Sequence, residues 1–299
     1  IGNKVNEIVH MSIKIGYYRD YFEIEEKYNH GEGCALPTAR ELPVDIEFNN
    51  VSFKYPSSES EDYALRNINL KIRKGEKLAV VGANGAGKTT LVKLLCGFYY
   101  PTEGNIRLNG HEILEYNIEE YYSLISAVFQ DIYLLPVTIA EFVSSSENEI
   151  DREKVTDAIC QAGLEDKVKA LPNGIDSRLM KGVFDDSIEM SGGEKQKLML
   201  ARALYKGAPL IVLDEPTAAL DPIAENKLYL KYSELTANKT SVYISHRLAS
   251  TRFCDRIIYL ENGRIVECGT HDELMKFCGK YAYMFDVQSH YYKEDVENA

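Results

Sequence analysis

The sequence predicts an α/β fold with a mainly parallel β-sheet. Four short apolar runs have the composition of strands that are buried on both faces, as parallel strands usually are: KLAVVG (77–82), LIVLD (210–214), SVYIS (241–245) and RIIYL (256–260). Stretches with helical periodicity lie between these runs. Such alternation of strands and helices is typical of a parallel sheet covered by helices.

Two more strands are expected ahead of the first apolar run. VDIEFNNVSFKYP, which begins at residue 44, alternates apolar and polar residues as a half-buried strand does. ALRNINLKIRKGE, which begins at residue 64, is expected to return as a second strand after the exposed loop SSESED (57–62).

Both ends of the chain are expected to lie outside the main domain. Residues 1–28 predict an amphipathic helix, because apolar residues recur at helical spacing. NHGEGCALPTARELP (29–43) has the Gly and Pro content of a linker, so a domain boundary is expected near residue 43. The predicted divisions are a helical extension with its linker over 1–43, the main domain over 44–285 with a mainly helical subdomain over about 131–208, and a tail over 286–299.

Composition limits the partners and the setting of the chain. The 34 Lys+Arg and 46 Asp+Glu residues give a net charge of −12, and so acidic a surface repels nucleic acid, which is not expected as a partner. No run approaches the roughly 18 apolar residues that span a bilayer. The chain begins with Ile1 rather than Met, so we expect a processed end or a piece of a longer polypeptide. The six cysteines show no CxxC pair and no zinc-type spacing, and are expected to be reduced and mostly structural.

A phosphate loop, GANGAGKT (82–89), matches the pattern GxxxxGK[ST] and lies between a buried strand and the helical stretch TTLVKLLCGF. Lys88 is expected to bridge the β- and γ-phosphates of ATP, Thr89 to bind Mg²⁺, and Thr90 to lie near the α-phosphate. A merely structural turn would not need the lysine. The remaining cradle positions are Gly82, Asn84, Gly85, Ala86 and Gly87.

Two carboxylates end the buried run LIVLDEPT (210–217). Asp214 stands where phosphoryl-transfer sites place a metal-coordinating aspartate. Glu215 follows it and could polarise the attacking water as a general base. Taken alone, two consecutive acidic residues after a strand usually lie in a solvent-exposed loop and have no catalytic role. Together with the phosphate loop, they predict an ATP-hydrolysing site.

Two further polar residues follow predicted strands. His246 ends SVYISH, and ligands bind at the carboxyl ends of parallel strands, so a contact to the γ-phosphate is expected although a lone histidine is most often structural. Gln130 follows LISAVF and is a weaker candidate when taken alone.

A second glycine-rich turn opens the stretch MSGGEKQKLMLARALYKG (190–207). Ser191, Gly192 and Gly193, which we call the signature turn, precede an amphipathic helix whose N-terminal N–H groups suit an anion. This turn supplies no lysine aimed at phosphates and no metal ligand, so it is an incomplete phosphate site.

The order of these motifs resembles the nucleotide-binding domain of ABC (ATP-binding cassette) transporters over about residues 44–285. The resemblance implies a P-loop NTPase core with an antiparallel β subdomain and a helical signature subdomain. The matching elements are Tyr55 in VSFKYP, GANGAGKTT (82–90), Gln130, MSGGEKQK (190–197), LIVLDEP (210–216), AALD (218–221) and ISHR (244–247).

The resemblance implies a role for each of these residues. Tyr55 would stack on adenine, and Gln130 would sense Mg²⁺ and the attacking water and signal toward the membrane domain. Glu215 would be the catalytic base, His246 the γ-phosphate contact, and Asp221 a residue crossing the dimer interface. Two such domains would pack head to tail, so that the signature turn of one chain completes the ATP site of the other.

The sequence departs from the family pattern at three places. The signature has Met190 and Glu194 where Leu and Gln are usual, and KGVFDDS (181–187) replaces a Glu-Gly-containing contact to the coupling helices.

The predicted helix at the N-terminus is expected to continue from a last transmembrane helix, as in exporters, which places the domain at the cytoplasmic face of the cell membrane. Alternatives are a soluble ABC-type ATPase acting on nucleic acid or ribosomes, disfavoured by the acidic charge, and a non-catalytic regulatory cassette, opposed by Glu215 and His246.

Overall fold

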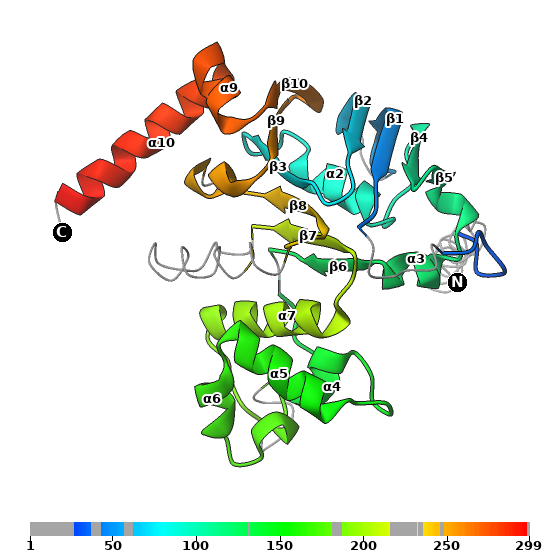
Figure 1. Cartoon of the computed structure of the whole chain (residues 1–299), viewed down its shortest axis with the longest axis vertical. Coiled ribbons are helices and arrows are strands. Elements are labelled where there is room, and N and C mark those ends of the chain that lie inside the picture. The colour runs from blue at the N-terminus through cyan, green and yellow to red at the C-terminus, as the bar shows by residue number, and fades with distance from the viewer. Residues whose placement is uncertain are drawn as a thin grey trace, which may run out of the picture.

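The computed structural model describes residues 27–36, 43–56, 62–130, 132–180, 187–215, 232, 236–245 and 248–297. Two sheets, a cluster of helices below them and several further helices beside the sheets make up the described part of the chain (Figure 1). The predicted helix over 1–28 falls almost entirely outside the described residues, as do Asp221, His246 and most of the segment 181–187.

The larger sheet has the strand order β10-β9-β3-β8-β7-β6. Its strands β6, β7, β8, β3 and β9 are parallel to their neighbours, and only the edge strand β10 is antiparallel. All four apolar runs are therefore confirmed as neighbouring strands of one mainly parallel sheet. The strands are β3 (Lys77–Gly82), β6 (Ile125–Val128), β7 (Leu210–Asp214), β8 (Thr240–Ile244), β9 (Arg256–Glu261) and β10 (Arg264–Gly269).

The smaller sheet is antiparallel and has the order β2-β1-β4-β5. The two strands predicted ahead of the parallel core pair directly, with Ile46 opposite Ile72 and Phe48 opposite Leu70. The second pair of strands forms a hairpin on the other side of β1. The strands are β1 (Ile46–Phe53), β2 (Leu65–Ile72), β4 (Glu103–Leu108) and β5 (His111–Glu112).

The parallel strands are buried on both faces, as their composition predicts. In β3, Leu78 and Val80 belong to the core shared with the antiparallel sheet and helix α2 (Lys88–Leu95), whereas Ala79 and Val81 belong to the core shared with the helical subdomain. This alternation follows from the two-residue period of a strand. The sheet thus lies between two cores, and its strand ends are held rigidly from both sides.

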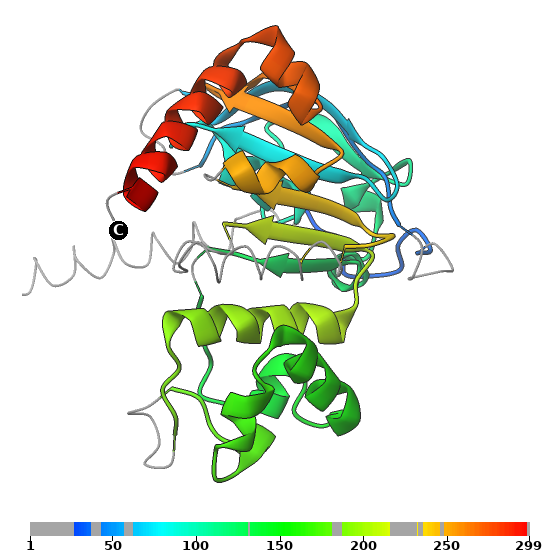
Figure 2. The ribbon, with the colours of Figure 1, turned by 60° about the vertical axis from the view of Figure 1, so that its left-hand side comes forward.

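A helical subdomain lies beyond the edge strand β6 of the parallel sheet (Figures 1 and 2), and its helix α7 contacts that strand. Its longest helix, α7, lies nearest the sheet, and its shorter helices lie beyond α7. Its position in the chain agrees with the helical subdomain predicted over about 131–208. Its helices are α4 (Ile139–Ser144), α5 (Arg152–Ala162), α6 (Glu165–Lys169), the 3₁₀ helix η2 (Gly174–Asp176) and α7 (Gly192–Lys206).

Two predicted boundaries differ from what the structure describes. The tail expected from residue 286 begins inside α10 (Lys280–Glu297), which continues across that position. Residues 29–36, part of the predicted linker, lie on the core, where Ile118 N donates to Asn29 O (2.9 Å) and Cys34 N donates to Glu115 O (2.8 Å). The other elements are η1 (Ile113–Glu115), α3 (Ile118–Ser123), η3 (Leu248–Phe253) and α9 (His271–Phe277).

A search of the described helices finds none that is both long and apolar enough to cross a membrane.

Candidate functional site

The phosphate loop connects the last residue of β3, Gly82, to the first residue of α2, Lys88. Gly87 precedes the helix with φ 103°, and a Cβ there would approach Ala64 O to 2.8 Å, so the position excludes any side chain. Gly85 has φ 76° and no atom within 4 Å of its would-be Cβ. The loop is therefore held against the protein at one glycine and opens to free space at another, which suits a backbone that must admit phosphates.

Lys88 is buried, with 5% of its surface exposed. Its Nζ donates hydrogen bonds to Gly82 O (2.9 Å) and Ala83 O (3.0 Å), so the ammonium lies inside the curve of the loop. Burial lowers the pKa of Lys88, and the charges of Glu215 and Asp214 act in the opposite direction. The structure thus confines one positive charge where the loop surrounds its ligand.

Asp214 is the last residue of β7 and is almost fully buried. Burial raises the pKa of its carboxyl to about 6, although a hydrogen bond with the Thr89 side chain lowers it in part. Among the described residues, Asp214 Oδ1 is a buried oxygen that makes no hydrogen bond. A buried, unsatisfied carboxylate oxygen is costly unless a ligand completes it. Asp214 and Thr89 therefore fit a hard divalent cation such as Mg²⁺, which prefers oxygen ligands.

Glu215 directly follows β7 and has a left-handed backbone, with φ 51°. Its N–H donates to Ile244 O (3.0 Å), which fixes the residue to the end of β8. Burial raises the pKa of Glu215, and the charge of Lys88 lowers it. This uncommon conformation at a strand end makes Glu215 a candidate functional residue.

Tyr55 lies beside the phosphate loop. Its hydroxyl is 3.0 Å from Thr90 Oγ1, at the start of α2. The ring packs edge-on against Phe53 and Tyr99, with centroids 4.9 and 5.3 Å away. These contacts fix the ring next to the helix that carries the loop while leaving it partly exposed.

Gln130 lies at the same edge of the sheet as the carboxylates. It follows β6 by two residues, and the last residue of β6, Val128, pairs with Leu213 just before Asp214. His246 lies outside the described residues, but Ile244, at the end of its strand β8, pairs with Asp214. Asp221 also lies outside the described residues.

The signature turn caps the N-terminus of α7. Ser191 Oγ accepts a hydrogen bond from Glu194 N (3.3 Å), and Ser191 N donates to Glu194 Oε2 (2.8 Å), which together form a capping box. Ser191 and Gly192 are exposed. Only residues 207–209 connect α7 to β7, so α7 runs back along the sheet and its N-terminus points to the same side as the strand ends (Figure 2).

The model of the ABC transporter family matches residues 65–218, which include the phosphate loop, the signature turn and both carboxylates. This chain belongs to the ABC transporter family. The predicted resemblance is confirmed, and so is the predicted α/β fold class.

Relatives of known name support the exporter type. The ATP-dependent lipid A-core flippase of Burkholderia pseudomallei (strain 1710b) is 38% identical over 267 residues, which cover 89% of this chain and 44% of that protein. The flippase of the same name from Salmonella typhimurium (strain LT2) is 38% identical over 245 residues, which cover 82% of this chain and 41% of that protein. The chain therefore spans less than half the length of these relatives.

A solved structure, described as a bacterial Atm1-family ABC exporter with ATP bound, has a TM-score of 0.79 and 29% identity to this chain. The likeness covers 94% of this chain and 48% of that one. The chain is thus an ATP-binding domain of the ABC exporter type, a domain of the ATPase class.

The turn between β9 and β10 supports the phosphate loop, and the sequence did not predict this contact. Gly263 N donates to Ala86 O (3.2 Å), and Gly263 O accepts from Arg66 N (2.8 Å), so the turn between β9 and β10 braces the loop. Asn262 and Gly263 both have positive φ. The Asn-Gly dipeptide signals a hairpin turn, but nothing local to it indicates that the turn touches residue 86.

Proposed function

We propose that this chain hydrolyses ATP at a site shared between two copies, or two similar domains, packed head to tail, and that this cycle powers an exporter. The observation that carries the proposal is a difference between the helix N-termini of α2 and α7, which lie on one side of the molecule: they are surrounded by different functional side chains. The phosphate loop gathers Lys88, Thr89 and two carboxylates. The signature turn is exposed, and in the described part of the chain its Ser191 bonds to Glu194, whose charge is already paired with Lys167.

In the proposed reaction, each residue acts through its position. Lys88 exchanges its bonds to the loop carbonyls for bonds to the β- and γ-phosphates. Glu215 accepts a proton from the attacking water, since its raised pKa brings it closer to neutral pH than a solvated glutamate. Gln130 orients that water from the end of β6, and His246 holds the γ-phosphate.

Asp214, Thr89 and Gln130 would hold Mg²⁺, which when bound would neutralise charge on the phosphate oxygens. The phosphate loop residues Asn84, Gly85, Ala86 and Gly87 would offer backbone N–H groups to the same oxygens. Tyr55 would present its ring to adenine, and Thr90 would meet the α-phosphate.

The partner's ATP would meet Ser191, Gly192 and Gly193. The Ser191 hydroxyl accepts a bond from Glu194 N, and its O–H, which also interacts with the Glu194 carboxylate in this structure, would turn to donate to a γ-phosphate. Asp221 would cross the same interface. Because each ATP would need both chains, closure becomes conditional on nucleotide, and binding free energy can drive a conformational change.

A transmembrane domain, joined to this domain in one longer chain, is the second proposed partner. A groove of about 560 Å³ between β6 and the helical subdomain includes Phe129, next to Gln130, and the bases Lys154, Arg202 and Lys206. The groove combines an apolar lining with positive charge, although the whole chain has a net charge of −12. This combination suits an acidic, amphipathic segment of the transmembrane domain at the cytoplasmic face of the membrane.

The test mixes two inactive variants. Ser191→Arg should block the ATP-dependent dimer of the Glu215→Gln background and abolish turnover, while ATP still binds the phosphate loop. Lys88→Ala should be inactive for the opposite reason. One mixed arrangement joins an intact phosphate loop to an intact signature turn, so a nucleotide-dependent mixed dimer should form, detected by size-exclusion chromatography, and activity should return if the two sites fire independently.

The outcome that contradicts the proposal is equally definite. If no mixed dimer and no activity appear, and Ser191→Arg alone weakens ATP binding to the monomer, the signature turn serves its own chain's site. Dimers that assemble equally well without nucleotide would also contradict the conditional closure.

A further inference from the structure

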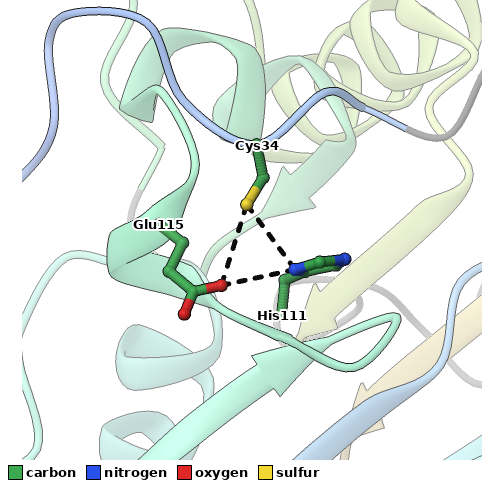
Figure 3. Close-up of side chains that lie close together, drawn as sticks. All are labelled: Cys34, His111 and Glu115. Atoms are coloured by element: carbon green, nitrogen blue, oxygen red, sulfur yellow. Dashed lines mark hydrogen bonds and ion pairs between the residues drawn. The ribbon is translucent and has the colours of Figure 1, made fainter.

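Outside the nucleotide site, a cysteine, a histidine and a glutamate converge on one point of the surface (Figure 3). Cys34 comes from the segment 27–36, whereas His111 and Glu115 come from β5 and the 3₁₀ helix η1. Cys34 Sγ lies 3.5 Å from His111 Nδ1 and 3.7 Å from a Glu115 carboxylate oxygen, and that oxygen lies 3.3 Å from His111 Nδ1.

These distances are those of one face of a tetrahedral zinc site. Bond lengths of about 2.3 Å for Zn–S and about 2.0–2.1 Å for Zn–N and Zn–O, at tetrahedral angles, separate sulfur from nitrogen or oxygen by about 3.6 Å and nitrogen from oxygen by about 3.3–3.4 Å. Each of the three measured separations agrees with its expected value within about 0.1 Å. A cation could therefore enter without moving the ligand atoms apart.

Backbone contacts tie the segment that carries Cys34 to the residues around Glu115 before any metal binds. Cys34 N donates to Glu115 O (2.8 Å), so the cysteine is tied directly to the residue that carries the carboxylate. Asn117 Nδ2 donates to Gly31 O (3.0 Å), which fixes the chain just ahead of it. A Cβ on Gly33 would lie 2.3 Å from Asn117 N, so the segment passes the core too closely for any side chain there.

We propose that Cys34, His111 and Glu115 bind a zinc ion, with a water in the fourth position. Thiolate, imidazole and carboxylate are all ligands that Zn²⁺ accepts, and the mixture of soft sulfur with nitrogen and oxygen disfavours Mg²⁺ and Ca²⁺. Binding replaces the thiol proton, which leaves to solvent. The ion would clamp residues 27–36 to the antiparallel β subdomain, far from the phosphate loop in the chain and independent of ATP.

No spacing pattern in the sequence indicates this site. The cysteines lack zinc-type spacing, and Cys34 is separated from His111 by 77 positions. Only the folding of 27–36 onto β5 and η1 brings the ligands together.

The test uses the purified, untagged chain, freed of metal with a chelator and titrated with Co²⁺ as a spectroscopic probe. Wild type should develop a thiolate-to-cobalt charge-transfer absorption that saturates at one ion per chain and disappears when Zn²⁺ is added. Cys34→Ser should lose this absorption. His111→Ala and Glu115→Gln should bind Zn²⁺ at least about 10–100-fold more weakly, because substitution of residues that only hydrogen-bond to metal ligands already weakens binding by that factor.

Cys160→Ser is the matched control, because Cys160 also points its thiol at a carboxylate, Glu165, at 3.4 Å. That variant should keep the absorption and the affinity unchanged. Zn²⁺ should also slow tryptic cleavage after Lys27 in wild type and in Cys160→Ser, but not in His111→Ala.

Circular dichroism of each variant serves as the control for folding. Absence of the absorption in wild type, or its survival in Cys34→Ser, would overturn the proposal and leave the cluster as an ordinary set of hydrogen bonds and an ion pair.

Discussion

The phosphate loop and the signature turn both place glycines at the N-terminus of a helix, but the protein equips them differently. At the phosphate loop, Lys88 donates to carbonyls of its own loop, and Asp214 Oδ1 is buried without a hydrogen bond to any residue that the structure describes. At the signature turn, Ser191 and Glu194 satisfy each other, and Lys167 pairs with Glu194 at 3.0 Å. The first region is incomplete without a ligand, whereas the second is already capped and only presents its exposed turn to a ligand held elsewhere.

The same contrast is visible in the acidity of the carboxylates. Burial raises the pKa of Asp214 to about 6. Burial also acts to raise the pKa of Glu194, but hydrogen bonds from Ser191 and the pair with Lys167 outweigh it and hold that pKa below its usual value. The ionised form of Asp214 is therefore disfavoured at the phosphate loop, where we propose the chemistry, whereas the ionised form of Glu194 is favoured at the signature turn.

The largest expected effect is that of Lys88→Ala on ATP binding. The substitution removes the positive charge confined within the phosphate loop, and charge-assisted hydrogen bonds contribute about 1.5–3 kcal/mol each. ATP affinity, measured by titration calorimetry, should fall by roughly 100-fold or more. Lys93→Ala, in the last turn of the same helix, is the control and should bind ATP as wild type does. Equal affinities of wild type and Lys88→Ala would refute the assignment.

Glu215→Gln should separate binding from turnover. The amide keeps the shape and the hydrogen bonding of the side chain but accepts no proton, so ATP affinity should survive while hydrolysis falls by roughly 10²-fold or more. Phosphate release measured at saturating ATP checks this expectation. Turnover within a few-fold of wild type would assign the base to another residue, with His246 the next candidate.

Tyr55→Ala should weaken ATP binding by about 1–3 kcal/mol, the range for stacking of a base on an aromatic ring. Tyr55→Phe keeps the ring and loses only the contact with Thr90, so it should retain most of the affinity. Neither substitution should change the affinity for inorganic triphosphate. An equal loss for triphosphate would mean that Tyr55 supports the loop rather than the adenine.

Much of the fold and of the site follows from local sequence. The apolar runs predict β3, β7, β8 and β9 because strands buried on two faces must be apolar throughout. The phosphate loop is recognisable because its glycines, lysine and threonine are consecutive in the chain. The parallel order of the strands then brings Asp214 and Gln130 to one edge.

What could not be predicted depends on contacts between distant segments. The bond between Thr89 and Asp214 and the unsatisfied Asp214 Oδ1 exist only because α2 packs across β7. Helix α10 continues through the tail boundary predicted at residue 286. Tyr281 and Phe285, one turn apart on α10, both pack against His271 of α9, which ties the start of that helix to the fold.

Asp214→Asn should stabilise the nucleotide-free protein, and only above acidic pH. A carboxyl whose pKa rises from 3.8 to about 6 on folding costs nothing when protonated in both states. As the pH rises from 3.8 to about 6, the unfolded state ionises first, so stability is lost progressively and the loss is complete above about pH 6. The free energy of unfolding in urea should therefore be higher for the variant by about 1–3 kcal/mol at pH 8.

The difference between wild type and Asp214→Asn should vanish near pH 3, and the variant should lose the Mg²⁺-dependent part of its ATP affinity. A variant less stable than wild type at pH 8 would mean that the Asp214 carboxylate is satisfied in the folded protein, against the contrast drawn here.

Ser191→Ala should have the opposite sign and the smallest effect on stability. It removes the side chain that caps α7, and loss of such a cap costs about 0.5–2 kcal/mol. Thr138→Ala is the matched control, because Thr138 forms the same capping box with Glu141 at the start of α4 in the same subdomain. Urea denaturation should give similar losses for the two variants. ATP-dependent dimerisation and turnover should fall only in Ser191→Ala, since in the proposed dimer only that hydroxyl would face a partner's nucleotide. Equal functional losses in the two variants would mean that Ser191 serves only as a helix cap.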